Sequence, residues 1–467
     1  MKTKISLMML LLAAWLLVGC EGQNEPTSEG GGSVESTDIA SVNKKINYYG
    51  TIYEVILKDG NRMYFAIKND KEVRMGCWSY FYDGSEYEYE KYAAYEYKGH
   101  LVIPEKITLE GKEYLVTELY NMSASSYSLS NMEITRLERP NTTLLSVVIP
   151  KTINKMKDGC FSFCTALKSV TFVNDSPIRE LSKTFVGCAS LKEVILPPNL
   201  SSVGANRGET FALCTSLKTI NLPETVTEIG YRAFIGCNSL EDINLENVKV
   251  IGKEGWGSSA FEGCTSLKTA NLESAIKIHK RTFSGCTSLK TVNLESAKKI
   301  YEHTFSGCTS LENVKLDNLE VLGREAFDSC TALQKVELPS IKYLGIDVEE
   351  DEENIWWDGD AFVDCHALET LILGSSLINT NGGRLFEGCE NLKDVYCYAI
   401  NPPMLDGWEE GASDNRVFIG DFVLHVPATS IEAYRETYWG KIYRFMEGSV
   451  DSYESVVGYR TIVAIEE

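Results

Sequence analysis

Apolar residues recur along most of this chain in repeated units. Each unit begins with a Phe, has a Cys three residues later and a Leu three residues after the Cys, so that FSGCTSLKTVNL at 283–294 returns as FSGCTSLENVKL at 305–316. Repeats of roughly 20 to 50 residues are typical of solenoid folds. The units begin at Phe161, Phe185, Phe211, Phe234, Phe261, Phe283, Phe305, Phe327, Phe362 and Phe386.

The Leu of each unit opens an alternating apolar run. Leu289, Val292 and Leu294 show this pattern, which predicts a strand with one buried face. Most units continue with a second apolar pair and a Gly, as in LPETVTEIGYRAF at 222–234. One unit cannot bury its apolar side alone, whereas stacked units share one core. We therefore predict a β-rich solenoid of parallel strands and short helical turns over residues 100–397.

The segments on either side of the repeats have different patterns. Residues 44–99 lack the repeat but are dense in alternating apolar runs, which predicts an N-terminal β-rich domain. The Tyr-rich part of this domain is expected to pack against the first coil, although an aromatic platform for a sugar is an alternative. Residues 398–467 include SIEAYRETY, a predicted helix, and are expected to form a C-terminal capping segment.

The N-terminus has the pattern of an export signal. Lys2 and Lys4 precede an uncharged stretch at 5–19, which is short for a membrane span and predicts a signal peptide over residues 1–19. The ending LVGC resembles a bacterial lipoprotein signal, which implies lipidation of Cys20; an ordinary signal with an incidental Cys is the alternative. Residues 20–43 are rich in Gly, Ser and Glu and predict a flexible tether.

The repeat itself resembles a known family. The unit FxGCTSLKxVxLPxxVxxIG is similar to the BspA-like leucine-rich repeat, and so are the flanking segments GHLVIPEKITLEGKEYLVTEL and LHVPATSIEAY. The resemblance covers roughly residues 100–440. It implies a leucine-rich repeat solenoid and a surface lipoprotein, and it implies adhesion to host or bacterial surface proteins or to glycans. The LP step is replaced by LES at Leu272 and Leu294, and four units are lengthened.

Composition narrows the class of partner. The formal net charge is −21, which argues against nucleic acid and against direct contact with an anionic membrane, because both require a basic face. We therefore expect a protein or glycan partner, with membrane association through the lipid anchor only. The expected location is the bacterial cell envelope, at the outer membrane or cell surface.

The fourteen cysteines follow the repeat rather than a disulfide pattern. Ten occupy the same place in successive units, which predicts a column of buried, reduced thiols, although some neighbours could be oxidised. Cys160 and Cys397 take the place of small or apolar residues, and Cys77 has no explanation. No metal site is expected, because single cysteines at repeat spacing do not form the CxxC pairs typical of zinc.

Outward residues of the predicted strands are candidates for binding. Lys192, Lys218, Lys268 and Lys290 recur at one position and indicate either a solvated face or a basic strip for an acidic partner. A second column of asparagines favours a ladder of side-chain amides that bond between successive coils, over direct contact with a partner.

The four lengthened units insert residues at one place, so we expect them to project from one edge. They are 203–211, 251–261, 344–362 and 378–386. Trp256, Trp356 and Trp357 lie in these insertions and either bind a partner or fold back over a neighbouring coil. Asp358 and Asp360 lack the regular spacing of a calcium loop.

Catalytic motifs are missing from the sequence. Its five histidines are scattered, with His279 and His303 at similar places before a Phe, and no nucleophile elbow, zinc motif or nucleotide loop occurs. We therefore expect neither an enzyme nor a cofactor. The leading hypothesis is a cell-surface binding or adhesion module; the alternative is an architectural envelope component with no soluble ligand.

Overall fold

The computed structural model describes the repeats and parts of both flanking segments. The described residues are 38–47, 50–76, 97–120, 127–130, 133–137, 140–204, 208–252, 258–345, 347–348, 355–356, 361–381, 385–406, 421–444 and 455–465. All of them belong to one compact unit, Gly31–Glu467. The predicted signal peptide, Cys20, most of the predicted tether and most of the Tyr-rich run lie outside the described residues, as do Cys77, Trp256 and Trp357.

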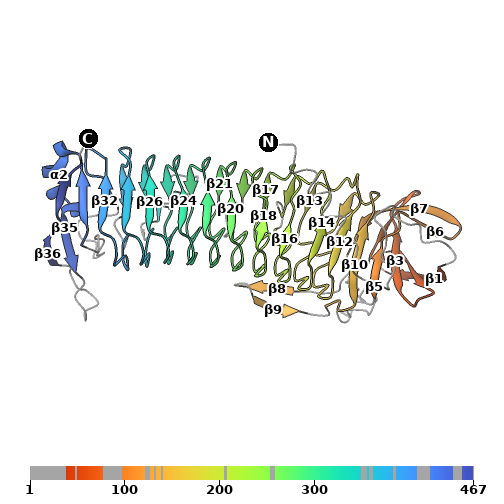
Figure 1. The fold of residues 1–467 in the computed structure, drawn as a ribbon. Helices are drawn as coiled ribbons and strands as arrows, with labels where there is room; N and C mark the ends of the chain where they lie inside the picture. Colours follow the sequence, from red (N-terminus) through yellow and green to blue (C-terminus); the bar gives the residue numbers. More distant parts are fainter. Residues whose placement is uncertain are drawn as a thin grey trace, which may run out of the picture. The chain divides into compact units, whose positions relative to one another are not determined.

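Each coil of the repeat contributes two short parallel strands. The second apolar pair of successive units forms a sheet in which every strand pairs with its counterpart in the next coil (Figure 1). This ten-stranded sheet consists of β13 (Glu180–Leu181), β15 (Ser202–Val203), β17 (Glu228–Ile229), β19 (Val250–Ile251), β21 (Lys277–Ile278), β23 (Lys299–Ile300), β25 (Val321–Leu322), β27 (Tyr343–Leu344), β31 (Asn379–Asn381) and β33 (Met404–Asp406).

The strand that follows each repeat Leu forms the opposite side of the coil. We call the outward side of these strands the strand face. It comprises β5 (Gly99–Val102), β10 (Leu144–Ile149), β12 (Ser169–Phe172), β14 (Glu193–Ile195), β16 (Thr219–Ile220), β18 (Asp242–Ile243), β20 (Thr269–Asn271), β22 (Thr291–Asn293), β24 (Asn313–Lys315), β26 (Lys335–Leu338), β30 (Thr370–Leu373), β32 (Asp394–Cys397), β34 (Val423–Val426) and β37 (Ile462–Ala464).

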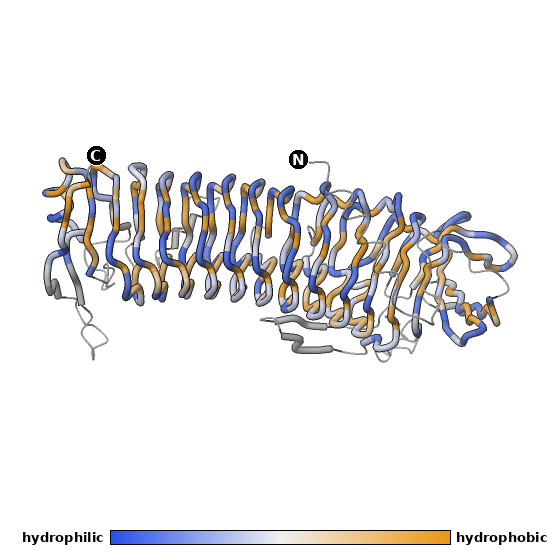
Figure 2. The backbone as a smooth tube through the Cα atoms, in the orientation of Figure 1, coloured by the Kyte–Doolittle hydropathy of each residue, from blue (hydrophilic) through white to orange (hydrophobic). Residues whose placement is uncertain are grey.

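The repeat Phe residues stack into one column inside the coils. Consecutive ring centroids lie 5.2 to 6.4 Å apart along the ten rings from Phe161 to Phe386. Beyond Phe386 the ring of Phe422 packs edge-on at 5.7 Å. Figure 2 shows the hydrophobic and hydrophilic positions alternating within each coil. The column confirms the solenoid that the repeat predicts.

The cysteine column is reduced and hydrogen-bonded. Each ladder thiol from Cys188 onward donates to the carbonyl of the preceding coil's Phe, with Sγ–O distances from 2.9 to 3.3 Å. The same carbonyl also accepts the N–H of the Cys three residues along its own coil, as Phe283 does from Cys286. This shared acceptor explains why the spacing between Phe and Cys does not vary. All twelve described cysteines are free and buried.

A left-handed residue closes each Phe-to-Cys turn. The glycine of FSGC has a φ of +70° at Gly285 and +72° at Gly307, a conformation that strains residues with a Cβ. Ser329 and Asp364 adopt the same conformation in their coils, at +58° and +54°. These segments are turns in the described coils, and the helices of the described residues lie at the C-terminus.

The N-terminal strands join the repeats through a shared sheet. β1 (Ile39–Asn47), β2 (Gly50–Leu57), β3 (Arg62–Ile67) and β4 (Glu72–Met75) form an antiparallel array, and β4 then pairs in parallel with β7 (Lys112–Leu119). β6 (Lys106–Leu109) and β11 (Lys155–Met156) also pair with β7, and β8 (Tyr127–Ser130) pairs with β9 (Glu133–Leu137). The sheet crosses the predicted boundary at residue 99, and the domain boundaries stay a prediction.

The C-terminal segment packs against the last coils. It contains η2 (Ala428–Ser430), α2 (Ile431–Arg435), η3 (Tyr438–Gly440) and the antiparallel pair β35 (Lys441–Arg444) and β36 (Ser455–Tyr459). Tyr434 and Trp439 are fully buried, and the Tyr434 hydroxyl donates to the carbonyl of Ala399 at 2.9 Å. These contacts cover the end of the apolar core, as repeat proteins require.

Candidate functional site

A shallow groove on the strand face is the candidate site. It has a volume of about 720 Å³, within the range of roughly 300 to 1,000 Å³ that is usual for ligand pockets. Residues in or next to β20, β22, β24 and β26 line it. They are Thr269, Ala270, Asn271, Glu273, Thr291, Val292, Asn293, Asn313, Val314, Lys315, Leu316, Asp317, Lys335 and Glu337.

Strand register arranges the lining of the groove in columns. Thr269 pairs with Thr291 and Thr291 with Asn313, and these three residues are exposed. Ala270 and Val292, which follow the threonines, point inward and are buried. Because side chains alternate across a strand, the next outward position forms a second column two residues further along. Within the groove this second column consists of Asn271, Asn293 and Lys315, which pair in register.

The asparagines of the second column differ in their hydrogen bonds. Asn244, just outside the groove, accepts the Leu222 N–H at 2.7 Å and donates to the Leu222 carbonyl at 2.9 Å. By contrast, the buried Oδ1 atoms of Asn271 and Asn293 have no hydrogen-bond partner among the described residues. An unpaired buried acceptor costs about 1–3 kcal/mol. The expected amide ladder is therefore formed at Asn244, while the two groove asparagines leave acceptors unused.

The length of the strands explains this difference. β16 and β18 are two residues long. Beyond the end of this pairing, the Asn244 side-chain amide bonds to both the N–H and the carbonyl of Leu222. β20 and β22 are three residues long, and there the Leu272 N–H bonds to the backbone carbonyl of Asn293 at 3.0 Å. The backbone carbonyl of Asn293 thus accepts the N–H that, by analogy with Asn244, its side-chain carbonyl would accept.

The two lysines that line the groove are paired with glutamates. Lys315 lies 3.3 Å from Glu295 and Lys335 lies 2.6 Å from Glu337. The Glu273 carboxylate accepts the Asn293 amide N–H at 3.3 Å. The groove therefore offers hydroxyl, amide and carboxylate groups without an excess of positive charge.

Three of the four candidate lysines also have acidic neighbours. Lys218 and Lys268 approach Glu241 at 3.8 and 2.6 Å, and Lys290 approaches Glu312 at 3.9 Å. Lys192 is exposed and has no ion-pair partner among the described residues. Because three of these lysines lie near glutamates of the same column, they have the pairing of a solvated face; binding by the four lysines stays a prediction, and we centre the site on the groove.

The tryptophan insertions are described only in part. β28 (Asp347–Val348) and β29 (Ile355–Trp356) form an antiparallel pair within the third insertion. The side chain of Trp356 is not described, and Trp256 and Trp357 lie outside the described residues. Binding by these three residues stays a prediction.

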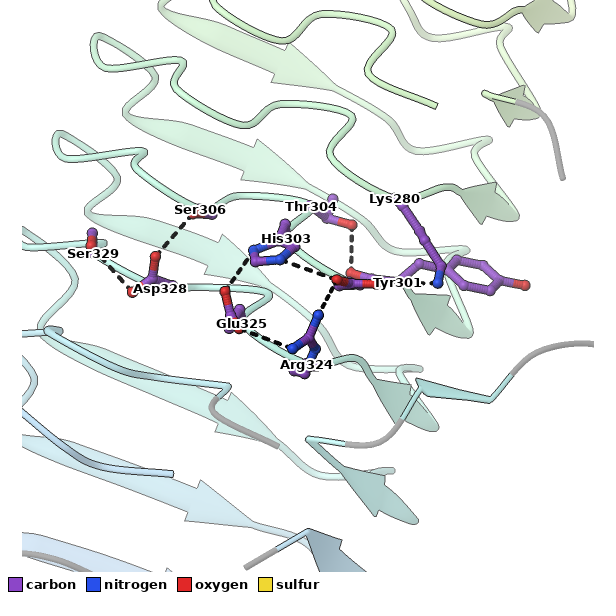
Figure 3. A network of polar contacts seen from close by, with 10 residues as sticks. Lys280, Tyr301, His303, Thr304, Ser306, Arg324, Glu325, Asp328 and Ser329 are labelled. Carbon is purple, nitrogen blue, oxygen red and sulfur yellow. Dashed lines mark hydrogen bonds and ion pairs between the residues drawn. The ribbon is translucent and has the colours of Figure 1, made fainter. Parts of the chain in front are cut away.

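A polar network at the other side of the coils surrounds His303 (Figure 3). Its Nε2 lies 3.1 Å from Glu302 and its Nδ1 lies 2.9 Å from Glu325, while Arg324 bonds to both glutamates and Lys280 lies 3.2 Å from Glu302. Burial lowers the pKa of His303, but the hydrogen bonds to Glu302 and Glu325 outweigh it and raise the pKa from 6.5 to about 9. The network joins three coils.

The two histidines that the sequence places in similar positions have different surroundings. His279 is buried and stacks on the Tyr301 ring at 5.1 Å, whereas His303 is two residues before its Phe and is held by carboxylates. The expectation of equivalence was wrong, because His279 stands four residues before Phe283 and so occupies a different place in the coil.

Neither a metal-binding cluster nor a membrane-spanning helix occurs among the described residues. No three His, Cys, Asp or Glu side chains there are grouped so that they could hold a metal ion. In the same part of the chain, no helix has the length and apolar character needed to span a bilayer.

The chain is similar to several solved structures and to one family model. No curated protein matches it. A leucine-rich repeat protein from Bacteroides ovatus is 22% identical (72% of this chain, 92% of that chain, TM-score 0.32). The pneumococcal vaccine antigen PcpA is 17% identical (92% and 100%, TM-score 0.41), and a T. pallidum leucine-rich repeat protein is 28% identical (45% and 87%, TM-score 0.31).

The family model matches the repeats themselves. Residues 134–256 and 254–355 match the BspA type leucine rich repeat region, in six copies. The matched segments contain the groove and the central part of the Phe and Cys columns. Residues 134–355 of this chain therefore belong to the BspA-type leucine-rich repeat region, in agreement with the Phe, Cys and Leu spacing of its units.

Proposed function

We propose that this chain is a cell-surface binding module that holds a protein or glycan partner on its strand face. The observation that carries the proposal is the polar groove across β20, β22, β24 and β26, lined by exposed residues such as Thr269, Thr291 and Asn313. Repeat proteins commonly bind partners on the extended surface that stacking creates.

The groove is supported by a rigid framework. Its strands pair in register with their neighbours, and the residues beneath them, including Leu272, Leu294 and Leu316, are 0 to 1% exposed. Side chains fixed in this way lose little conformational entropy when a partner binds, which favours affinity. The same framework supplies one polar row per coil, which suits a partner that extends over several coils.

Surface attachment is the second part of the proposal. The signal at 1–19 and the tether at 20–43 support export and a lipid on Cys20. Digestion of intact cells with a protease tests this placement. Accessible repeats support the surface module, whereas protected repeats favour the architectural envelope component. A Cys20→Ala variant should leave the membrane fraction.

Blocking the groove tests the binding site whatever the partner is. Thr291 is exposed on β22, and a Thr291→Trp variant would fill the groove without altering the buried core. We expect binding of the purified protein to intact cells to fall at least tenfold, which corresponds to about 1.4 kcal/mol. The melting temperature should stay the same.

A matched control is available on the same column. Thr219 is exposed on β16, outside the groove, so Thr219→Trp should leave cell binding intact. Equal binding by the wild-type protein and both variants would refute the groove as the binding site.

A further inference from the structure

We propose that a strip of lysines on the ten-stranded sheet binds an acidic segment of a partner protein. This lysine strip consists of the first residue of β19, β21, β23, β25 and β27 and the residue before each of them. Its members are Lys249, Val250, Ile276, Lys277, Lys298, Lys299, Glu320, Val321, Lys342 and Tyr343. The ten-stranded sheet lies on the side of the coils opposite the strand face, so the inference does not depend on the groove.

Strand register places three of the lysines next to one another. Lys277 pairs directly with Lys299, and Lys298 precedes Lys299 in the same coil. Neighbouring strands lie roughly 4.7–4.9 Å apart. Like charges directly opposite each other on neighbouring strands are destabilising. A partner that brings carboxylates to this part of the sheet would relieve the repulsion.

The strip contains little negative charge of its own. Its one acidic member, Glu320, lies 3.2 Å from Lys298 and 2.7 Å from Lys342. Lys249 and Lys299 have no ion-pair partner within the described part of the chain. Five lysines against one glutamate make the strip locally basic, on a chain whose formal net charge is −21.

The glutamates of the adjoining turns are occupied by other cations. Glu302 and Glu325 follow β23 and β25, and both belong to the network around His303 (Figure 3). Arg324 bonds to both glutamates, and Lys280 lies 3.2 Å from Glu302. Their negative charge is balanced within that network, so it does not neutralise the lysine strip.

Apolar side chains within the strip favour a protein partner over a charged glycan. Ile276 is 51% exposed, and its N–H bonds to the carbonyl of Lys249 at 2.9 Å, which places it beside that lysine. Val250 and Tyr343 are half-buried. A protein segment that carries apolar residues between its carboxylates can cover these side chains and remove their surface from water. A chain of charged sugars offers mainly hydroxyl and charged groups.

The charge of the whole chain disfavours an anionic membrane as the partner. A lipid surface is much larger than the strip, and it would also meet the acidic remainder of a chain with a net charge of −21. A short acidic segment can contact the lysines alone.

An acidic polymer tests the strip directly. The probe is a fluorescent random copolymer of glutamate and tyrosine, titrated with the purified protein and followed by anisotropy at low and at high salt. We expect binding at low salt that weakens at high salt, because salt screens exposed charges. Hyaluronate, a carboxylated glycan, and vesicles that contain phosphatidylglycerol are the alternative ligands. Failure of the copolymer to bind, or tighter binding of hyaluronate or of the vesicles, would overturn the inference.

Neutral substitutions locate the binding on the sheet. The double variant Lys277→Gln, Lys299→Gln should bind the copolymer at least tenfold more weakly, at an unchanged melting temperature. The matched control is Lys58→Gln, Lys71→Gln, which removes the same charge from exposed lysines beside the N-terminal strands and should bind as the wild-type protein does. Wild-type affinity in the strip variant, or an equal loss in both double variants, would contradict the assignment.

An Ile276→Ser variant tests the apolar part of the strip. Because Ile276 is exposed, the substitution leaves the core intact. Its affinity for the copolymer should fall severalfold, while its affinity for polyglutamate, which has no apolar side chains, should stay the same. An unchanged affinity for the copolymer would mean that the strip recognises charge alone, and would refute its assignment to a protein segment.

Discussion

The ladder cysteine joins each coil to the one before it. Its thiol fills the space beside the Phe column and donates to a carbonyl of the neighbouring coil, at 3.2 Å for Cys308 to Phe283. Cys308 is 0% exposed, and burial raises the pKa of its thiol. Such a residue stabilises the stack and is not available for surface chemistry.

Truncation of one ladder cysteine should therefore weaken the fold measurably. Cys308→Ala leaves a small cavity and removes one hydrogen bond, and we expect it to cost about 1–2 kcal/mol of the free energy of unfolding. Urea denaturation measures this. Thr309→Ala, at the exposed neighbouring residue, is the control; it removes only a long, exposed bond from Thr309 Oγ1 to the Thr287 carbonyl at 3.4 Å and should change stability by less than about 0.5 kcal/mol. Equal effects of the two substitutions would contradict the role of the ladder.

At the residue scale the sequence predicts the core better than the site. The fixed spacing of Phe, Cys and Leu identifies the inward positions directly. The unpaired state of Asn271 and Asn293 is not visible in the sequence, because Asn221 and Asn244 occupy the same column. It depends on whether the local strand is two or three residues long, which is set by pairing with the next coil.

Elements in adjacent coils are joined by the His303 network as well as by strand pairing. Because the folded pKa of His303, about 9, lies above its ordinary 6.5, its protonation stabilises the folded state. That stability is fully present below pH 6.5 and is lost as the pH rises through 9. Glu302, Glu325, Arg324, Lys280 and Arg281 are the charged groups around it.

A His303→Gln variant should reveal this pH dependence. Between pH 6 and 9 the stability of the wild-type protein should approach that of the variant, because Gln cannot supply the positive charge that both carboxylates use. Paired urea titrations at several pH values measure the difference. A constant difference between the two proteins across this range would show that His303 does not titrate in the folded state as described.

At the element scale the alternating runs predict the strand face, and the second apolar pairs correspond to the ten-stranded sheet. The pattern does not predict the β8–β9 pair in the irregular stretch before Thr143, or the β28–β29 pair inside the third insertion. Each of these pairs is antiparallel and local, and its residues lack the repeat spacing that marks the coils. Turn chemistry alone gives a weaker signal than ten aligned units.

For the whole molecule, the column of buried thiols should make the free energy of unfolding fall as the pH becomes alkaline. Ordinary thiols have a pKa near 9.0, and burial raises the pKa in the folded ladder, as at Cys214, Cys264 and Cys330. The contribution of these thiols to the free energy of unfolding is therefore fully present below pH 9. Above pH 9 it falls by about 1.4 kcal/mol per pH unit for each thiol that unfolding exposes.

The slope of stability against pH reports how many coils unfold together. If the ten described cysteines whose thiol pKa is raised in the folded state become exposed in one step, the loss above pH 9 should be far steeper than that for a single thiol. Urea denaturation of the reduced protein between pH 8 and 10 measures it. A slope no greater than that for one thiol would mean that coils unfold separately or that the thiols are not buried.

We propose that the stacked core holds one groove of the strand face ready for a partner. Site-directed protection tests it directly, because the twelve described cysteines are buried. In a chain carrying Cys20→Ser and Cys77→Ser, Thr291→Cys introduces an exposed thiol in the groove, and Thr219→Cys introduces one outside it. The measurement is the alkylation rate of each thiol in the presence and absence of the intact cells that the proposed function expects the protein to bind. We predict that bound cells slow alkylation at position 291 and leave position 219 unchanged; equal rates at position 291 with and without cells would contradict the account.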